Sequence, residues 1–151
     1  MVKKLLSFII CVLATCVVCA QERSGNEVID LMLESIADTE VEVEQAFEEL
    51  GIQSKINLYF DERRNELVFS YQFFSEKIFK TFDLEAGKNG AISAMFSELL
   101  NQEDSGDALE WFTNEFKRTN TGIRMKVVYE EQVRSILITS REIQRLASLL
   151  Y

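Results

Sequence analysis

Two stretches of the chain alternate between apolar and polar residues with the period of a β-strand. The first, Lys55–Ser70, reads KINLYFDERRNELVFS, and the second, Ile123–Ser140, reads IRMKVVYEEQVRSILITS. In each stretch two alternating runs flank a short charged segment, which follows an aromatic residue, Phe60 in the first and Tyr129 in the second. We therefore predict two β-hairpins of similar construction, the first with a turn of four or five residues.

One face of each predicted hairpin is apolar, because alternate residues of a strand point to the same side. This face comprises Ile56, Leu58, Phe60, Leu67, Phe69, Tyr71 and Phe73 in the first hairpin and Met125, Val127, Tyr129, Ile136 and Ile138 in the second. An isolated hairpin in water is marginally stable. We expect the two hairpins to join edge to edge into a four- to five-stranded antiparallel sheet, in which the weakly alternating segment Lys77–Leu84 is the optional fifth strand.

Helical periodicity flanks and separates the hairpins. The predicted helices are Gly25–Leu50, with a break near Asp38, a segment around Ile92–Leu99, Asp107–Arg118, and Ile143–Leu150. Gly51 suits the end of the first helix, and Glu85–Gly90 is expected to be a loop. The predicted fold class is α+β, in the order α-β-β-(β)-α-α-β-β-α, with helices packed on the apolar face of the sheet.

Three residue pairs match the capping-box pattern, in which a Ser or Thr begins a helix and a Glu three residues later bonds back to it. These are Ser24 with Glu27, Thr39 with Glu42, and Thr139 with Glu142, and Asp107 with Glu110 is a similar pair with Asp in the first position. We expect all four to mark helix starts.

Residues 1–20 have the pattern of a cleaved secretory signal peptide. Two lysines precede the apolar run Leu5–Val18, which is shorter than a membrane-spanning helix requires, and Val18 and Ala20 are small residues suited to cleavage before Gln21. We expect a bacterial periplasmic protein that is not inserted in a membrane once the signal is removed, with residues 21–151 forming a single domain. Lipid attachment at Cys16 is the alternative.

Composition removes several classes of chemistry. The chain has no histidine, and its three cysteines all lie within residues 1–20. The mature chain therefore lacks a Ser-His-Asp triad, a thiol nucleophile, a disulfide and the usual zinc ligands. Loss of residues 1–20 takes two lysines and no acid, so the net charge falls from −9 to −11. Such a charge disfavours nucleic acid; we expect no nucleic-acid partner, cofactor or metal, and we assign no catalytic residue.

Three local features carry weaker hypotheses. An acidic tract could bind cations or a basic partner, although such tracts more often form the solvated face of a helix; it comprises Asp38, Glu40, Glu42, Glu44, Glu48 and Glu49. The loop Asn101–Asp107 is rich in oxygen ligands, but an EF-hand begun at Asn101 would require glutamate where Phe112 stands. Trp111 could stack on a ligand, but we expect it to pack in the core.

The second face of the predicted sheet carries a candidate partner surface. Its apolar residues are Tyr59, Val68, Val128 and Leu137. A contiguous exposed apolar patch often marks a binding site. The alternative is that a helix crosses this face and turns these residues into a second core.

The composition favours an exported, acidic, non-enzymatic binding or scaffolding domain that acts through a sheet face or edge, with homodimerisation as a corollary. One alternative is a hydrolase or lyase that uses two carboxylates or a tyrosine, which requires a buried acid of perturbed pKa. Another is a carrier of an apolar small molecule, suggested by the eleven phenylalanines. The order of elements is similar to that of small α+β secretion-chaperone domains, and order alone implies no function.

Overall fold

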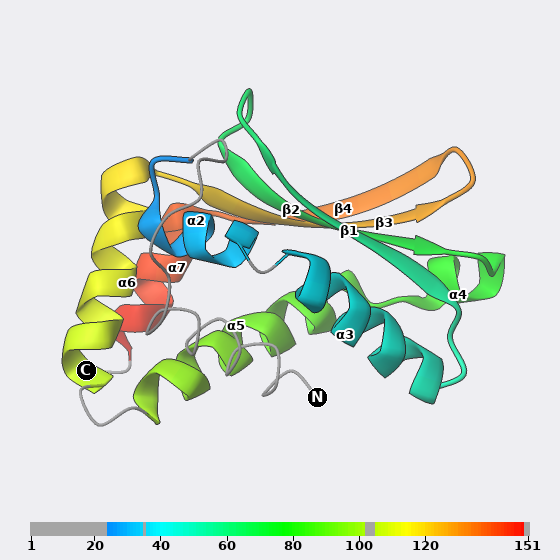
Figure 1. Ribbon diagram of the computed structural model, residues 1–151, viewed down its shortest axis with the longest axis horizontal. Coiled ribbons are helices and arrows are strands. Elements are labelled where there is room, and N and C mark those ends of the chain that lie inside the picture. Colours follow the sequence, from blue (N-terminus) through cyan, green and yellow to red (C-terminus); the bar gives the residue numbers. More distant parts are fainter. Residues whose placement is uncertain (1–23, 35, 102–104, 150–151) are drawn as a thin grey trace.

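The computed structural model describes residues 24–34, 36–101 and 105–149, so the predicted leader lies outside the described residues. Its elements are α2 (Glu27–Glu34), α3 (Ile36–Glu49), β1 (Ser54–Asp61), β2 (Glu66–Phe73), α4 (Glu76–Thr81), α5 (Leu84–Leu100), α6 (Ser105–Thr119), β3 (Gly122–Tyr129), β4 (Gln132–Ile138) and α7 (Ser140–Ser148). The predicted α+β class and order of elements are confirmed. Figure 1 shows the sheet as one layer and the helices as the other.

The four strands lie in the order β1-β2-β3-β4, with antiparallel pairing inside each hairpin. The two central strands pair in parallel, with Leu67 opposite Ile123 and Tyr71 opposite Val127. The sheet is therefore mixed, and the expectation of an antiparallel sheet is wrong at this junction. The reason is the connection, because α4, α5 and α6 together return the chain to the end of the sheet where β2 began.

The optional fifth strand, Lys77–Leu84, is instead the helix α4 and the start of α5. Ser75 caps α4 by accepting a hydrogen bond from the Ile78 amide, and Phe79 is the buried residue of this short helix. The apolar run was too short for its periodicity to separate a helix from a strand.

The expected loop Glu85–Gly90 is part of the helix α5. Its glycines suggested a turn, but a single glycine inside a helix is tolerated at a cost of about 1 kcal/mol relative to alanine. A Cβ at Gly87 would make only ordinary contacts, at 3.4 Å from Met125 Cε and 3.5 Å from the Phe82 ring.

The apolar face of the sheet packs on the helices in two clusters. The larger joins α2, α5, α6 and α7 to the sheet and contains Val28, Ile29, Leu58, Leu67, Ile92, Phe96, Leu109, Phe112, Phe116, Ile123, Ile138, Ile143 and Ala147. The smaller lies nearer α3 and α4 and contains Phe73, Phe79, Leu84, Met125 and Val127, with Phe47 and Tyr71 against them. Rows of paired residues run from strand to strand on this face, so each cluster crosses the parallel junction.

The capping box predicted at Thr139 is confirmed, and it connects two helices. The Thr139 hydroxyl accepts from the Glu142 amide at 3.2 Å, and Glu142 Oε2 accepts from the Thr139 amide at 2.8 Å. Glu142 Oε1 also pairs with Lys88 Nζ of α5 at 3.0 Å. The Thr139 amide and the Lys88 ammonium both favour the carboxylate, so the pKa of Glu142 is lowered.

The helix starts predicted at Thr39 and Asp107 are wrong, because Thr39 lies inside α3 and Asp107 lies inside α6. The capping box predicted at Ser24 is also wrong. The residue that caps α2 is Asn26, whose side-chain oxygen accepts from the Ile29 amide at 3.1 Å. Ser24 instead donates to Asp30 at 2.7 Å. Asn26 is fully buried and also donates to Thr119 at 2.8 Å, so a contact with α6 decides where the helix starts.

Replacing Glu142 with glutamine should destabilise the protein at neutral pH, and the deficit should shrink in acid. A lowered pKa in the folded state contributes stability that is present above the unfolded value near 4.3 and is lost as the pH falls through the folded pKa. Urea unfolding of wild type and Glu142→Gln between pH 7 and pH 3 measures this. Glu62→Gln, in the β1–β2 turn, is the control and should match wild type at pH 7; a Glu142→Gln deficit that is constant with pH would refute the assignment.

Candidate functional site

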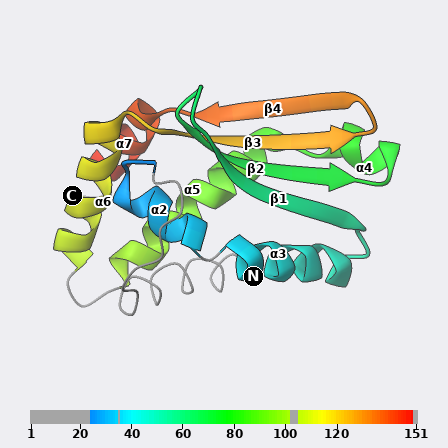
Figure 2. The same cartoon turned by 45° about the horizontal axis from the view of Figure 1, so that its top comes forward.

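The second face of the sheet is open in the part of the chain that the structure describes. Figures 1 and 2 show the described helices on one side of the sheet, with none crossing the other side. We call this side the open face. It carries Tyr59, Val68, Arg124 and Leu137, which are paired across all four strands.

The sheet register brings three of the four predicted partner residues together. Tyr59 pairs with Val68 and Leu137 pairs with Arg124, which stands between Val68 and Leu137. Val128 lies four residues further along β3, where its partner on β4 is Val133. The open face therefore has two small apolar groups rather than one continuous strip.

The charged side chain of Arg124 lies within the first of these groups, between Val68 and Leu137. Arg124 makes a two-pronged ion pair with Glu66, with contacts of 2.6 and 2.9 Å, and also donates to the Ser135 hydroxyl at 3.0 Å. Hydrogen bonding to Glu66 raises the Arg124 pKa, so the guanidinium stays charged. Val68 beside it is only 2% exposed without any described helix above it. Its paired neighbours on this face are Tyr59 on β1 and Arg124 on β3.

The second apolar group is more accessible. Val133, at the start of β4, is 54% exposed, whereas Tyr59, Val128 and Leu137 are partly buried. Sequence reasoning missed Val133 because alternation alone did not indicate how far its neighbours would cover it. Among the residues of the four strands, the large apolar side chain with the greatest exposure thus lies on an edge strand.

The β1 edge of the sheet is blocked by the acidic helix α3. The Leu58 amide donates to Glu40 Oε1 at 2.9 Å, and the Ile56 amide donates to Glu44 Oε1 at 2.8 Å. The spacing of the two carboxylates matches the spacing of the two amides. Glu40 and Glu44 are four residues apart on a helix, a rise of about 6 Å, and Ile56 and Leu58 are two residues apart on a strand, a rise of about 6.6 Å. Two carboxylates of the acidic tract therefore satisfy outward backbone N–H groups of an edge strand, a role that the sequence did not indicate.

The β4 edge has no such cover among the described residues. No described strand pairs with its outer side, and no described side chain hydrogen-bonds to the backbone of Gln132–Ile138. Figure 2 shows β4 at the border of the sheet. The strand reads QVRSILI, with one arginine and no acid, in a chain that has 25 acidic residues. An uncovered edge strand offers a template for pairing with another chain.

The described ionisable groups with shifted pKa values do not suit acid–base catalysis. Glu115 is buried, but its pKa is lowered, chiefly by its hydrogen bonds with Arg118, and also by the Glu27 amide. A catalytic acid working at neutral pH requires a raised value. Burial raises the pKa of Tyr71 to about 12, which suppresses the phenolate that a tyrosine base would need. The hydrolase hypothesis gains no support from these groups.

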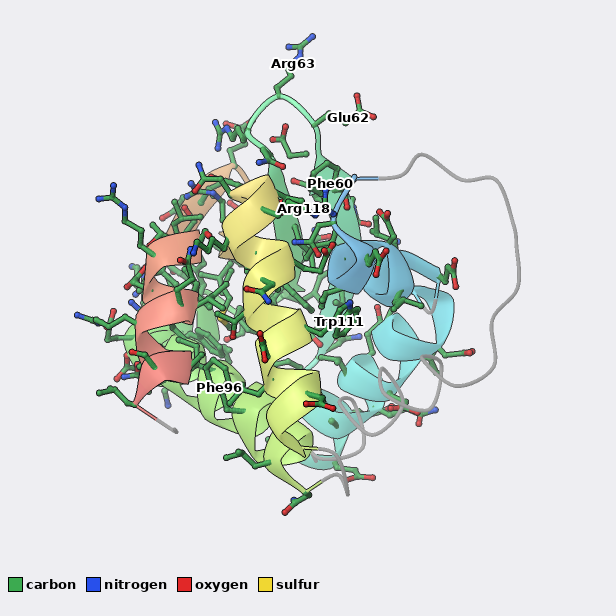
Figure 3. The ribbon with its side chains drawn as sticks, turned by 90° about the vertical axis from the view of Figure 1, so that its left-hand side faces the viewer. Phe60, Glu62, Arg63, Phe96, Trp111 and Arg118 are labelled. Atoms are coloured by element: carbon green, nitrogen blue, oxygen red, sulfur yellow. The ribbon has the colours of Figure 1, made fainter. Side chains whose placement is uncertain are left out.

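Trp111 belongs to α6 and lies on the side of that helix that faces α2 (Figure 3). It is partly buried, and its Nε1 donates to Glu27 Oε2 at 3.2 Å. The ring lies against the larger core cluster, as a packing residue does.

The centre of the oxygen-rich loop Asn101–Asp107, residues 102–104, lies outside the described residues. Within the described part of the chain, no group of three or more His, Cys, Asp or Glu residues is placed to hold a metal ion.

Comparisons with family models, with curated proteins and with solved structures find no match to this chain. Of the helices in the described ranges, none combines the length and apolar character needed to cross a membrane.

Removing both carboxylates that block the β1 edge should expose its amides. In Glu40→Ala/Glu44→Ala we expect the Ile56 and Leu58 amides to exchange at least about tenfold faster, since each loses an acceptor worth roughly 1–3 kcal/mol. Hydrogen exchange followed by NMR measures both amides. Glu49→Ala removes an acid of the same helix without touching β1 and should leave exchange unchanged; equal effects of the two variants would show that α3 does not block this edge.

Proposed function

We propose that the protein is an exported, non-enzymatic binding or scaffolding domain whose contact surface is the β4 edge with the adjoining open face. The observation that carries this proposal is the difference between the two edges. Glu40 and Glu44 occupy the outward amides of β1, whereas the backbone of β4 has no described partner on its outer side. Proteins normally protect edge strands, so an edge that stays bare is a candidate for binding.

The occupant that we propose is a second copy of the chain, paired through β4 about a twofold axis. The open-face residues of β4 are Val133, Ser135 and Leu137, which are spaced evenly about Ser135. Antiparallel pairing centred on Ser135 places each Val133 opposite Leu137 of the other copy, giving two apolar cross-strand pairs. Because β4 has no acid, this contact avoids the repulsion expected between two strongly negative chains.

A positive charge introduced on the apolar edge should abolish self-association. We expect residues 21–151 to form a dimer at micromolar concentration and Val133→Lys to be a folded monomer, because the lysines of two copies would replace the Val133–Leu137 contacts. Val41→Lys is a matched control, since Val41 is 52% exposed, close to the 54% of Val133, and lies on α3. Sedimentation velocity gives the mass. A wild-type chain that is still monomeric at about 100 μM, where a dimer of micromolar Kd would be almost fully formed, would contradict the proposal.

Export is part of the same proposal and is supported by the pattern of residues 1–20. We expect the protein expressed with its full sequence in a Gram-negative host to be recovered from the periplasm with Gln21 as its first residue. Intact-mass spectrometry of the recovered protein reads this directly. A mass that corresponds to a lipid-modified chain beginning at Cys16 would indicate anchoring instead, and an uncleaved chain in the cytoplasm would refute export.

A further inference from the structure

The two ends of the edge strand β4 differ in charge. Residues 117–151 contain seven lysines and arginines and only three acidic residues, whereas the whole chain has 16 basic and 25 acidic residues. Two of those three acids, Glu130 and Glu131, form the turn that precedes β4. The helix α7 follows β4 and carries two exposed arginines, Arg141 and Arg145. Figure 2 shows β4 running along the border of the sheet from this turn to α7, so its start is acidic and its end is basic.

A charged side chain at each end of β4 has no partner among the described residues. Glu131 and Arg141 are both exposed and take part in none of the described ion pairs. Two neighbouring charges are already bound within the chain, because Glu142 pairs with Lys88 and Arg134 donates to a carbonyl oxygen of α4. Glu131 and Arg141 are therefore the opposite charges that stay available for a second molecule.

We propose that Arg141 of one copy pairs with Glu131 of the other, so that two symmetric ion pairs fix the orientation and register of the dimer. This inference rests on the twofold β4 pairing proposed above. In antiparallel pairing centred on Ser135, Val133 lies opposite Leu137 of the second copy, and continuing this register places Glu131 beside the first turn of α7. Arg141 lies in that turn, and its long side chain can reach the carboxylate. The twofold axis repeats the contact on the other side.

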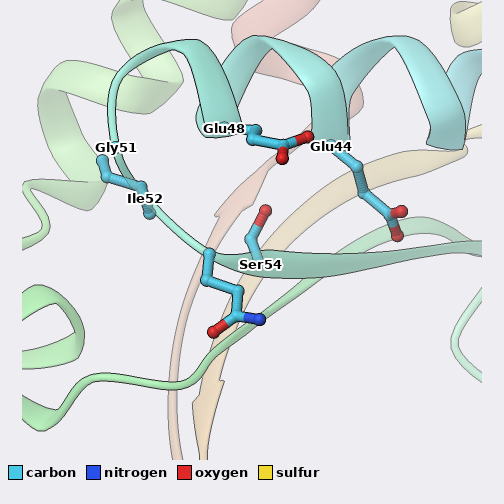
Figure 4. Close-up of a pocket in the computed structure, with 6 residues that line it drawn as sticks. Glu44, Glu48, Gly51, Ile52 and Ser54 are labelled. Atoms are coloured by element: carbon cyan, nitrogen blue, oxygen red, sulfur yellow. The ribbon is translucent and has the colours of Figure 1, made fainter.

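The same charges disfavour other ways of pairing the strands. Parallel pairing of two β4 strands would place Glu131 near Glu131 and Arg141 near Arg141, and like charges at close range repel. A head-to-tail contact between β4 and the β1 edge of a second copy would bring basic and acidic surfaces together, but α3 already occupies outward amides of β1. The Ile56 amide donates to Glu44, and Figure 4 shows the Glu44 side chain reaching from α3 toward the start of β1.

Exchanging the two charges tests this contact. Sedimentation velocity over a range of concentrations gives the dimer Kd of residues 21–151 and of each variant. Arg141→Glu and Glu131→Arg should each weaken the dimer at least roughly tenfold, because two attractive contacts per dimer become two repulsive ones. The double variant Arg141→Glu/Glu131→Arg restores opposite charges and should return the Kd to within about threefold of wild type.

Arg63→Glu is the matched control, because it makes the same charge change on an exposed arginine of the β1–β2 turn, at the β1 side of the sheet (Figure 3). It should change the Kd less than about twofold, since exposed charges more than about 10 Å apart are largely screened at 0.1 M salt. A double variant no tighter than the single variants, or equal effects of Arg141→Glu and Arg63→Glu, would refute this contact alone. A monomeric wild type would refute the dimer and the contact with it.

Discussion

The parallel pairing of β2 with β3 is the constraint on which the rest of this structure depends. Each hairpin alone has an apolar face that it cannot bury, and pairing the two central strands makes one surface wide enough for a helical layer. Both core clusters cross this junction, at Leu67 beside Ile123 and at Tyr71 beside Val127. The same pairing determines which strands are left as edges, and therefore where the chain can contact other molecules.

The acidic helix α3 has three consequences for the sheet that it accompanies. Through Glu40 and Glu44 it satisfies the outward amides of β1 and so removes one edge from association. Its last turn carries Glu48 and Glu49 and no basic residue, which makes the start of β1 acidic. Because α3 lies along the β1 edge, the acid-free β4 is the edge whose outer side has no partner among the described residues. The strongly charged helix α3 thus makes the β1 edge of the sheet chemically different from the β4 edge.

Local signals predicted the elements well, and long-range contacts account for what was missed. Alternation located all four strands, and Thr139 with Glu142 gave a correct helix start, because these features depend on residues close in sequence. Asn26 displaced Ser24 as the cap of α2 through a bond to Thr119, which is remote in sequence. Gly87 and Gly90 resembled turn residues, but both lie inside α5. The edge-blocking role of Glu40 depends on which strand lies beside α3, and no local pattern records that.

The most direct test of the account is the register of the central strands in solution. NMR on the isotopically labelled chain of residues 21–151 would detect short backbone proton distances between neighbouring strands. The account predicts cross-peaks between β2 and β3 at Val68 with Arg124 and at Ser70 with Lys126, in the pattern of parallel strands. Cross-peaks confined to the two hairpins, or an antiparallel pattern between β2 and β3, would contradict it.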